Sequence, residues 1–153
     1  MALLFWSTSY SPGRAQAEIQ QLLLSIGARR ISQEYSSTGV AGMSFELETV
    51  SGRQEYLLPV RTDAVREVLR RHGVLRGAGQ RGSTEIQRAH AESVAWRTLL
   101  EWLKVQAAIV ETEQAAAAEV MLPYMLVGGN GAGPRTTVYE QFTLLPQLPE
   151  PVG

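Results

Sequence analysis

Apolar residues recur every three or four positions over residues 12–26, and this spacing predicts an amphipathic helix. Ser11 is placed to cap the first turn, and Pro12 suits the first helical position because no N–H partner is needed there. Gly27 predicts the end of the helix, since glycine adopts the left-handed conformation at little steric cost. The apolar positions are Ala15, Ile19, Leu22, Leu23 and Ile26.

After this helix the period changes to two, which is typical of strands with one buried face. The positions that share a face are Ile31, Gln33 and Tyr35, then Met43, Phe45 and Leu47, then Tyr56, Leu58 and Val60. Ser51 and Gly52 provide a tight turn between the last two runs. Pro59 lacks an N–H and belongs at the end or edge of its strand. We therefore expect an antiparallel meander covered by the first helix, and another strand over residues 2–9.

A second, shorter helix is predicted between Thr62, which can cap it, and Gly73. Its inward positions are Val65, Val68 and Leu69. Residues 73–83 then contain four glycines and no acid, so we expect a mobile, basic loop there.

The longest helical pattern begins at Ser83 or Thr84 and runs to about Glu119. Its apolar stripe comprises Ile86, Val94, Leu99, Leu103, Ala107 and Val110. One unbroken helix of this length would extend about 54 Å, more than a domain of this size is wide. We therefore expect a break, with Thr112 as the N-cap of a second helix over residues 114–121.

The C-terminal residues predict a small hairpin, in which residues 124–127 pair with residues 135–139 across a glycine-rich turn. Residues 146–153 hold three prolines and one charge and are expected to form an extended tail. Together these elements predict an α+β fold for residues 1–145: an N-terminal antiparallel sheet covered by a helix, then a helical half with a small hairpin.

The composition excludes several kinds of chemistry. The chain of 153 residues has no cysteine, which excludes thiol catalysis and cysteine-ligated zinc. His72 and His90 are the two histidines, too few for a three-histidine metal site within one chain. No nucleophile stands beside a base in the sequence, so we expect neither catalysis nor a cofactor or metal.

Charged residues recur throughout, and no stretch approaches the roughly 18 apolar residues that span a bilayer. The short apolar run over residues 3–6 carries no preceding lysine or arginine, unlike a signal peptide. We expect a cytoplasmic protein with no membrane partner.

Four motifs of the second half resemble those of uncharacterised bacteriophage and prophage proteins. They are Trp96-Arg97-Thr98-Leu99-Leu100, Leu103-Lys104-Val105-Gln106-Ala107, Val120-Met121-Leu122-Pro123-Tyr124-Met125-Leu126 and Arg135-Thr136-Thr137-Val138-Tyr139-Glu140. The front half is similar as well, with a helix ending in Gly-Ala and a strand ending in Leu58-Pro59. The resemblance implies a viral or mobile-element context, hence a host-cell cytoplasm, and transfers no catalytic residue.

Charge is distributed unevenly along the chain. Residues 61–97 hold eight arginines and four acids, whereas residues 101–153 hold two basic residues and six acids. The first segment predicts a phosphate-binding rim, and Tyr35 and Trp102 are candidate platforms for stacking unpaired bases. The candidate arginines are Arg66, Arg70, Arg71, Arg76, Arg81 and Arg88. The alternative is that these arginines pair with the acidic helix or simply face solvent.

These sequence features favour two alternative functions. The first is a non-catalytic protein that binds single-stranded nucleic acid, for instance an annealing factor. The second is an interaction or assembly protein, such as a host-factor inhibitor or a structural component, that acts through its long alanine-rich helix. The small side chains of Ala107, Ala108 and residues 115–118 allow close approach of another helix and favour a homo-oligomer.

Overall fold

The computed structural model describes residues 4–37, 39–73, 83–129 and 134–144, and these form an α+β fold. The first half contains α1 (Pro12–Ser25), β1 (Arg29–Ser36), β2 (Gly39–Thr49), β3 (Gly52–Pro59) and α2 (Thr62–Arg71). The second half contains α3 (Ser83–Glu111), α4 (Ala117–Met121), the 3-10 turn η1 (Leu122–Tyr124), β4 (Leu126–Val127), β5 (Thr136–Thr137) and α5 (Val138–Thr143).

Helix α1 begins and ends where its local sequence predicts. The Ser11 hydroxyl accepts a hydrogen bond from the Arg14 N–H, and Pro12 occupies the first turn. Gly27 has a φ of +97° and follows the helix, while the Ala28 N–H returns to the Leu23 carbonyl. This left-handed closure satisfies carbonyls that the helix leaves unpaired, and it sends the chain directly into β1.

The three strands pair in the order β1-β2-β3, all antiparallel, as expected. Met43, Phe45 and Leu47 are buried on one face of β2, and the Phe45 ring stacks on Tyr56 of β3 at 5.4 Å between centroids. Pro59 ends β3, which is an edge strand of this sheet. The strand tolerates it because its missing N–H removes no bond to β2.

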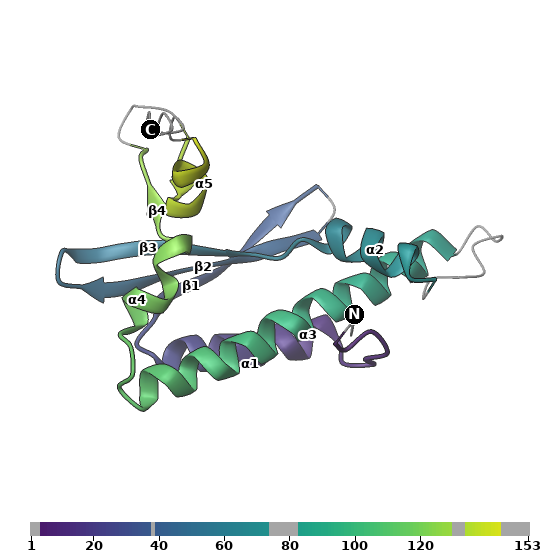
Figure 1. Ribbon diagram of the computed structural model, residues 1–153, viewed down its shortest axis with the longest axis horizontal. Coiled ribbons are helices and arrows are strands. Elements are labelled where there is room, and N and C mark those ends of the chain that lie inside the picture. Colours follow the sequence, from purple (N-terminus) through teal and green to yellow (C-terminus); the bar gives the residue numbers. More distant parts are fainter. Residues whose placement is uncertain (1–3, 38, 74–82, 130–133, 145–153) are drawn as a thin grey trace, which may run out of the picture.

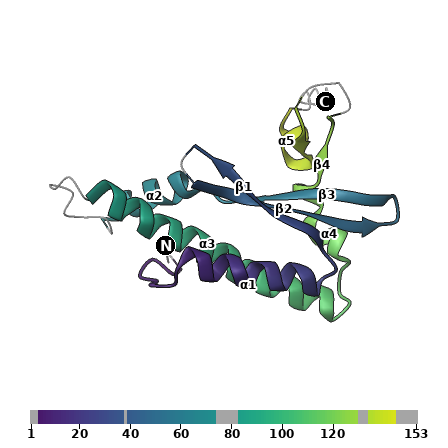
Figure 2. The ribbon, with the colours of Figure 1, turned by 180° about the vertical axis from the view of Figure 1, so that it is seen from behind.

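Helices α1 and α3 run side by side along the same face of the sheet, and the core lies between these two layers (Figures 1 and 2). The largest side chains that are fully buried there include Ile19, Leu23, Trp96, Leu100 and Leu103. A smaller cluster of Leu69, Ala91 and Val94 holds α2 against the N-terminal part of α3. The predicted helix over the sheet is therefore joined by a second.

Residues 4–9 are not a strand, contrary to expectation: residues 4–7 form a turn, with Phe5 at a φ of +63°. This segment lies against α3 instead, where His90 Nε2 hydrogen-bonds to the Trp6 carbonyl and the Arg97 guanidinium covers the Phe5 ring. The apolar run is short, and helix α3 offers it an apolar and cationic surface without any strand pairing. Hydrophobicity alone does not distinguish these two outcomes.

The predicted break in the long helix is present, but its cap is not Thr112. The Thr112 hydroxyl donates back to the Ala108 carbonyl, so Thr112 closes α3. Glu113 then takes a left-handed φ of +60°, and Ala116 precedes α4 with its N–H bonded to Glu119. Two smaller expectations are also wrong. Thr62 is the first residue of α2 rather than its cap, and Ile86 is 70% exposed.

The predicted hairpin is confirmed as β4 paired with β5. The strand is shorter than expected, because Thr137 caps α5 by accepting the Glu140 N–H, so Tyr139 is helical. Tyr56 of β3 bridges to Met125, which ties this region to the sheet edge, and α5 stands beyond β3 away from α1 and α3 (Figure 1). Most of the predicted loop, residues 74–82, and the predicted tail, residues 146–153, lie outside the described residues.

Candidate functional site

The candidate site is the end of the molecule where α2 meets the start of α3 (Figure 1). Leu69 packs on Ala91 and Val94, with Val65 beside it, and this fixes which side of α2 is buried. Of the predicted arginines on α2, Arg70 and Arg71 are exposed, and Arg66 is partly buried beside the packed face. Arg88 joins them from α3 through an ion pair of 3.7 Å with Asp63.

The arginines of this end differ in how far they are neutralised. Arg70 makes a two-pronged contact with Glu67, at 3.0 Å from Nε and 2.7 Å from Nη2. This hydrogen bonding lowers the pKa of the Glu67 carboxyl below its usual value and raises that of Arg70. Arg66 and Arg71 make no ion pair with any residue that the structure describes. Arg71 is exposed and Arg66 is partly buried, so Arg71 is the better placed of the two to meet an external phosphate.

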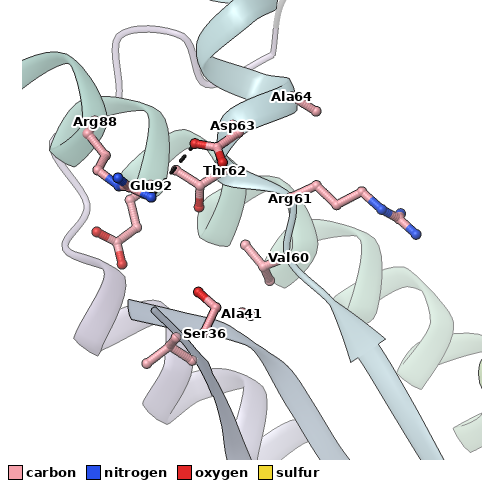
Figure 3. A pocket seen from close by; sticks show the side chains of 10 residues that line it. Ser36, Ala41, Val60, Arg61, Thr62, Asp63, Ala64, Arg88 and Glu92 are labelled. Carbon is pink, nitrogen blue, oxygen red and sulfur yellow. Dashed lines mark ion pairs between the residues drawn. The ribbon is translucent and has the colours of Figure 1, made fainter. Parts of the chain in front are cut away.

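A polar cleft of about 400 Å³ opens beside these arginines, between the N-terminus of α2, α3 and the end of the sheet (Figure 3). Arg88 and Asp63 lie across it, Glu92 projects from α3 below them, and Arg61 points away from it. With Arg61 pointing away, the cleft presents two acids and one arginine, and the surplus of positive charge lies on the outer side of α2.

Sequence and fold together separate positive from negative charge. Residues 61–88 contain seven arginines and three acids, a net charge of +4, while the whole chain carries −1, which leaves −5 for all other residues. Both flanks of the segment that holds Arg76 and Arg81 are anchored here, because α2 ends and α3 begins at this end. Arg76 and Arg81 themselves lie outside the described residues.

The acidic side chains of the alternative interpretation, in which the arginines pair with the acidic helix, lie elsewhere. Glu111, Glu113 and Glu119 are at the opposite end of α3, and no ion pair joins any of them to a described arginine. The neutralising groups are Asp63 and Glu67 instead. Neither was predicted from the sequence, although the spacing of three between Glu67 and Arg70 is typical of a helical ion pair.

Tyr35 and Trp102 do not form a joint stacking platform. Tyr35 is 72% exposed on β1, one edge of the sheet, where its hydroxyl donates to Gln33. Trp102 is half-buried beside β3, the opposite edge, with its ring edge-on to Tyr124 at 5.9 Å. Both residues are at least partly accessible to solvent, but they lie on different surfaces of the protein. Neither lies on the polar side of α2.

The open face of the sheet pairs its acidic side chains with a hydroxyl group and with arginines. Ser44 donates to Glu34 across β1 and β2 at 2.8 Å. Further along, Arg30 and Arg53 lie 3.7 and 3.9 Å from the carboxylate of Glu46. Acids and arginines alternate on this face, so its charge is balanced locally.

Within the described residues, no three acidic or histidine side chains come together as the ligands of a metal would. His72 follows the last turn of α2 as its C-cap, and His90 contacts the Trp6 carbonyl. None of the described helices combines the length and apolar character that crossing a bilayer requires.

Comparison with protein-family models, with curated proteins and with solved structures finds no match to this chain. The resemblance to uncharacterised phage proteins therefore stays a prediction.

Proposed function

We propose that this protein binds the phosphate backbone of single-stranded nucleic acid, without catalysis, through the α2/α3 end. The observation that carries the proposal is the concentration of net charge +4 in residues 61–88 of a chain whose total is −1. A field of this kind attracts a polyanion from a distance and retains it by releasing counterions.

The choice of arginine supports a single strand as the ligand. A guanidinium group can grip phosphate with two donors and can also stack on an exposed base, which lysine does poorly. Residues 61–88 contain no lysine. Because Tyr35 and Trp102 lie elsewhere, backbone contacts rather than aromatic stacking account for the affinity in this proposal, and little sequence preference follows.

The test is fluorescence anisotropy of a labelled single-stranded oligonucleotide and of its duplex, across a range of salt concentrations. Affinity should fall as salt rises, and the single strand should bind more tightly. Replacing Arg66 and Arg71 together by alanine should flatten the logarithmic salt slope by about two, because two phosphate contacts are lost.

A matched control replaces Arg29 and Arg53 by alanine, two exposed arginines at the opposite end of the sheet from α2. This control removes the same charge and should leave the slope nearly unchanged. An absence of binding at tens of micromolar protein in low salt would overturn the proposal, as would equal effects of the two double variants.

A second candidate function, self-association as an assembly protein, is favoured by α5. Its Tyr139 and Phe142, with Leu144 just after it, are each more than half exposed. The Ala-rich helix is less suited to this role than the sequence suggested, because Ala107 is buried within the chain. If two copies meet through α5, sedimentation at high micromolar concentration should show a dimer that Phe142→Ser converts to monomer. A wild-type monomer there would exclude it.

A further inference from the structure

An apolar groove of about 350 Å³ lies between β3, α2, α3 and η1, away from the basic side of α2. Leu58, Pro59, Val65 and Leu99 form its floor and sides, and the edge-on pair of Trp102 and Tyr124 forms one wall. Aromatic rings beside aliphatic side chains at an accessible surface are typical of peptide-binding grooves.

The backbone of β3 restricts which peptide the groove can accept. The Val60 N–H bonds to the Ala41 carbonyl of β2, so the neighbouring Pro59 directs its backbone to the outer edge, towards the groove. Proline has no N–H to offer there, and an added β-strand would lack a donor. A polyproline II segment has no such requirement, because it makes no ladder of backbone hydrogen bonds.

The chain itself supplies a segment of this kind. Residues 145–153 read Leu-Pro-Gln-Leu-Pro-Glu-Pro-Val-Gly, in which Pro146 and Pro149 have the Pro-x-x-Pro spacing. Proline at this density favours polyproline II and lowers the entropy lost on docking. The segment contains two leucines and one valine to fill an apolar groove, and its one charged side chain is Glu150.

The position of the described C-terminus places this segment within reach. The described chain ends at Leu144, just after α5, and α5 lies against η1, which carries Tyr124 of the groove wall. The six residues from Leu145 to Glu150 extend about 19 Å as polyproline II. Arg61 lines the groove, is exposed, and points away from the polar cleft (Figure 3), so it can meet the carboxylate of Glu150.

We propose that residues 145–153 dock as a polyproline II segment in the groove of their own chain, against Trp102 and Tyr124, with Glu150 beside Arg61. This goes beyond the proposed nucleic-acid function and does not depend on it. The groove is then an intramolecular docking site for the C-terminal segment.

The chain has no cysteine, so one introduced pair reports proximity without background. The double variant Arg61→Cys with Glu150→Cys, in the 153-residue chain, should form a disulfide within one chain in a buffer of oxidised and reduced glutathione. It should do so at least about tenfold faster than Arg53→Cys with Glu150→Cys, since docking raises the effective concentration. Arg53 is a fair control because it is an exposed arginine near the start of β3, whereas Arg61 is an exposed arginine just after the end of that strand. Equal rates, or a disulfide formed only between two chains, would overturn the proposal.

A second measurement avoids the introduced thiols. In a Trp6→Phe background, Trp102 is the accessible tryptophan among the described residues, because Trp96 is fully buried. Replacing Pro146, Pro149 and Pro151 by alanine should shift the emission to the red and increase quenching by acrylamide, with an unchanged far-ultraviolet circular dichroism spectrum. Adding the free nonapeptide of residues 145–153 should reverse the shift. Unchanged emission and quenching in the triple variant would contradict docking at Trp102.

Discussion

The two ends of α3 carry opposite charge, and at each end the side chains have the same sign of charge as the helix dipole. At the N-terminal end, α2 brings Arg66, Arg70 and Arg71 close to a helix terminus that is itself partly positive. At the C-terminal end, Glu111 and Glu113 lie where the dipole is partly negative, and the last turn contains no basic residue. Across the 29 residues of α3, about 43 Å, side chains and dipole therefore reinforce one field.

Charged side chains have two different effects in this protein, a long-range field along α3 and local ion pairing on the sheet. A helix optimised only for stability places acids first and bases last, and of the charged residues at these termini only Glu85 in the first turn follows that rule. On the open sheet face, by contrast, Arg30 and Arg53 each lie beside Glu46. Similar arginines thus contribute a long-range field at one place and local neutralisation at another, so their number alone does not define a binding surface.

The largest effect is expected from Leu69→Ala, which removes the side chain that docks α2 on α3. Leu69 is fully buried in a cluster separate from the main core, so the substitution should cost about 2–4 kcal/mol of local stability. Hydrogen exchange should rise in α2 while α1 and the sheet stay protected. Uniform loss of protection throughout the molecule would show that the basic end is not an independent unit.

A substitution at the acidic, C-terminal end of α3 should have a smaller effect on stability than Leu69→Ala, and it should stabilise the protein. Glu113 occupies a left-handed conformation at φ +60°, the position that Gly27 occupies after α1. Glu113→Gly should relieve this strain and remove an acid from the negative end of the dipole, raising the free energy of unfolding by about 1 kcal/mol. Urea denaturation measures this change in the free energy of unfolding. Gly27→Ala is the converse control and should destabilise by a similar amount.

The sequence predicts the structure of α1 and the meander better than that of the C-terminal end of α3. Helix α1 and the meander follow from local patterns, because Ser11, Pro12 and Gly27 each favour one backbone conformation and the strands alternate clearly. The end of α3 does not, since a threonine such as Thr112 can bond forward as a cap or back to the preceding turn. A glutamate in the left-handed region has no sequence signature at all.

The candidate site was predictable only in part. The arginines of α2 reach one side because their helix is amphipathic, which the pattern shows. The roles of Tyr35 and Trp102 depend on which sheet edge each one meets, a tertiary property that spacing does not encode. The groove at Pro59 and Tyr124 joins residues 65 positions apart, so no local pattern indicated it.

The smallest expected effect concerns Glu67, which neutralises Arg70 within the basic end. Hydrogen bonding to Arg70 holds the pKa of Glu67 below its usual 4.5, so this pair stabilises the fold above about pH 4.5. That contribution is lost as the pH falls through the lowered pKa. Glu67→Gln removes it, and the stability difference between wild type and variant should therefore shrink on acidification below pH 4.5.

The same substitution frees Arg70 to meet phosphate, so at neutral pH the salt slope of oligonucleotide binding should steepen by up to about one. Glu48→Gln is the matched control, because Glu48 also pairs with an exposed arginine, Arg53, but at the far end of the sheet. It makes the same change in net charge. If both variants bind the oligonucleotide equally well, net charge alone sets the affinity, and the arrangement of arginines on α2 has no part in it.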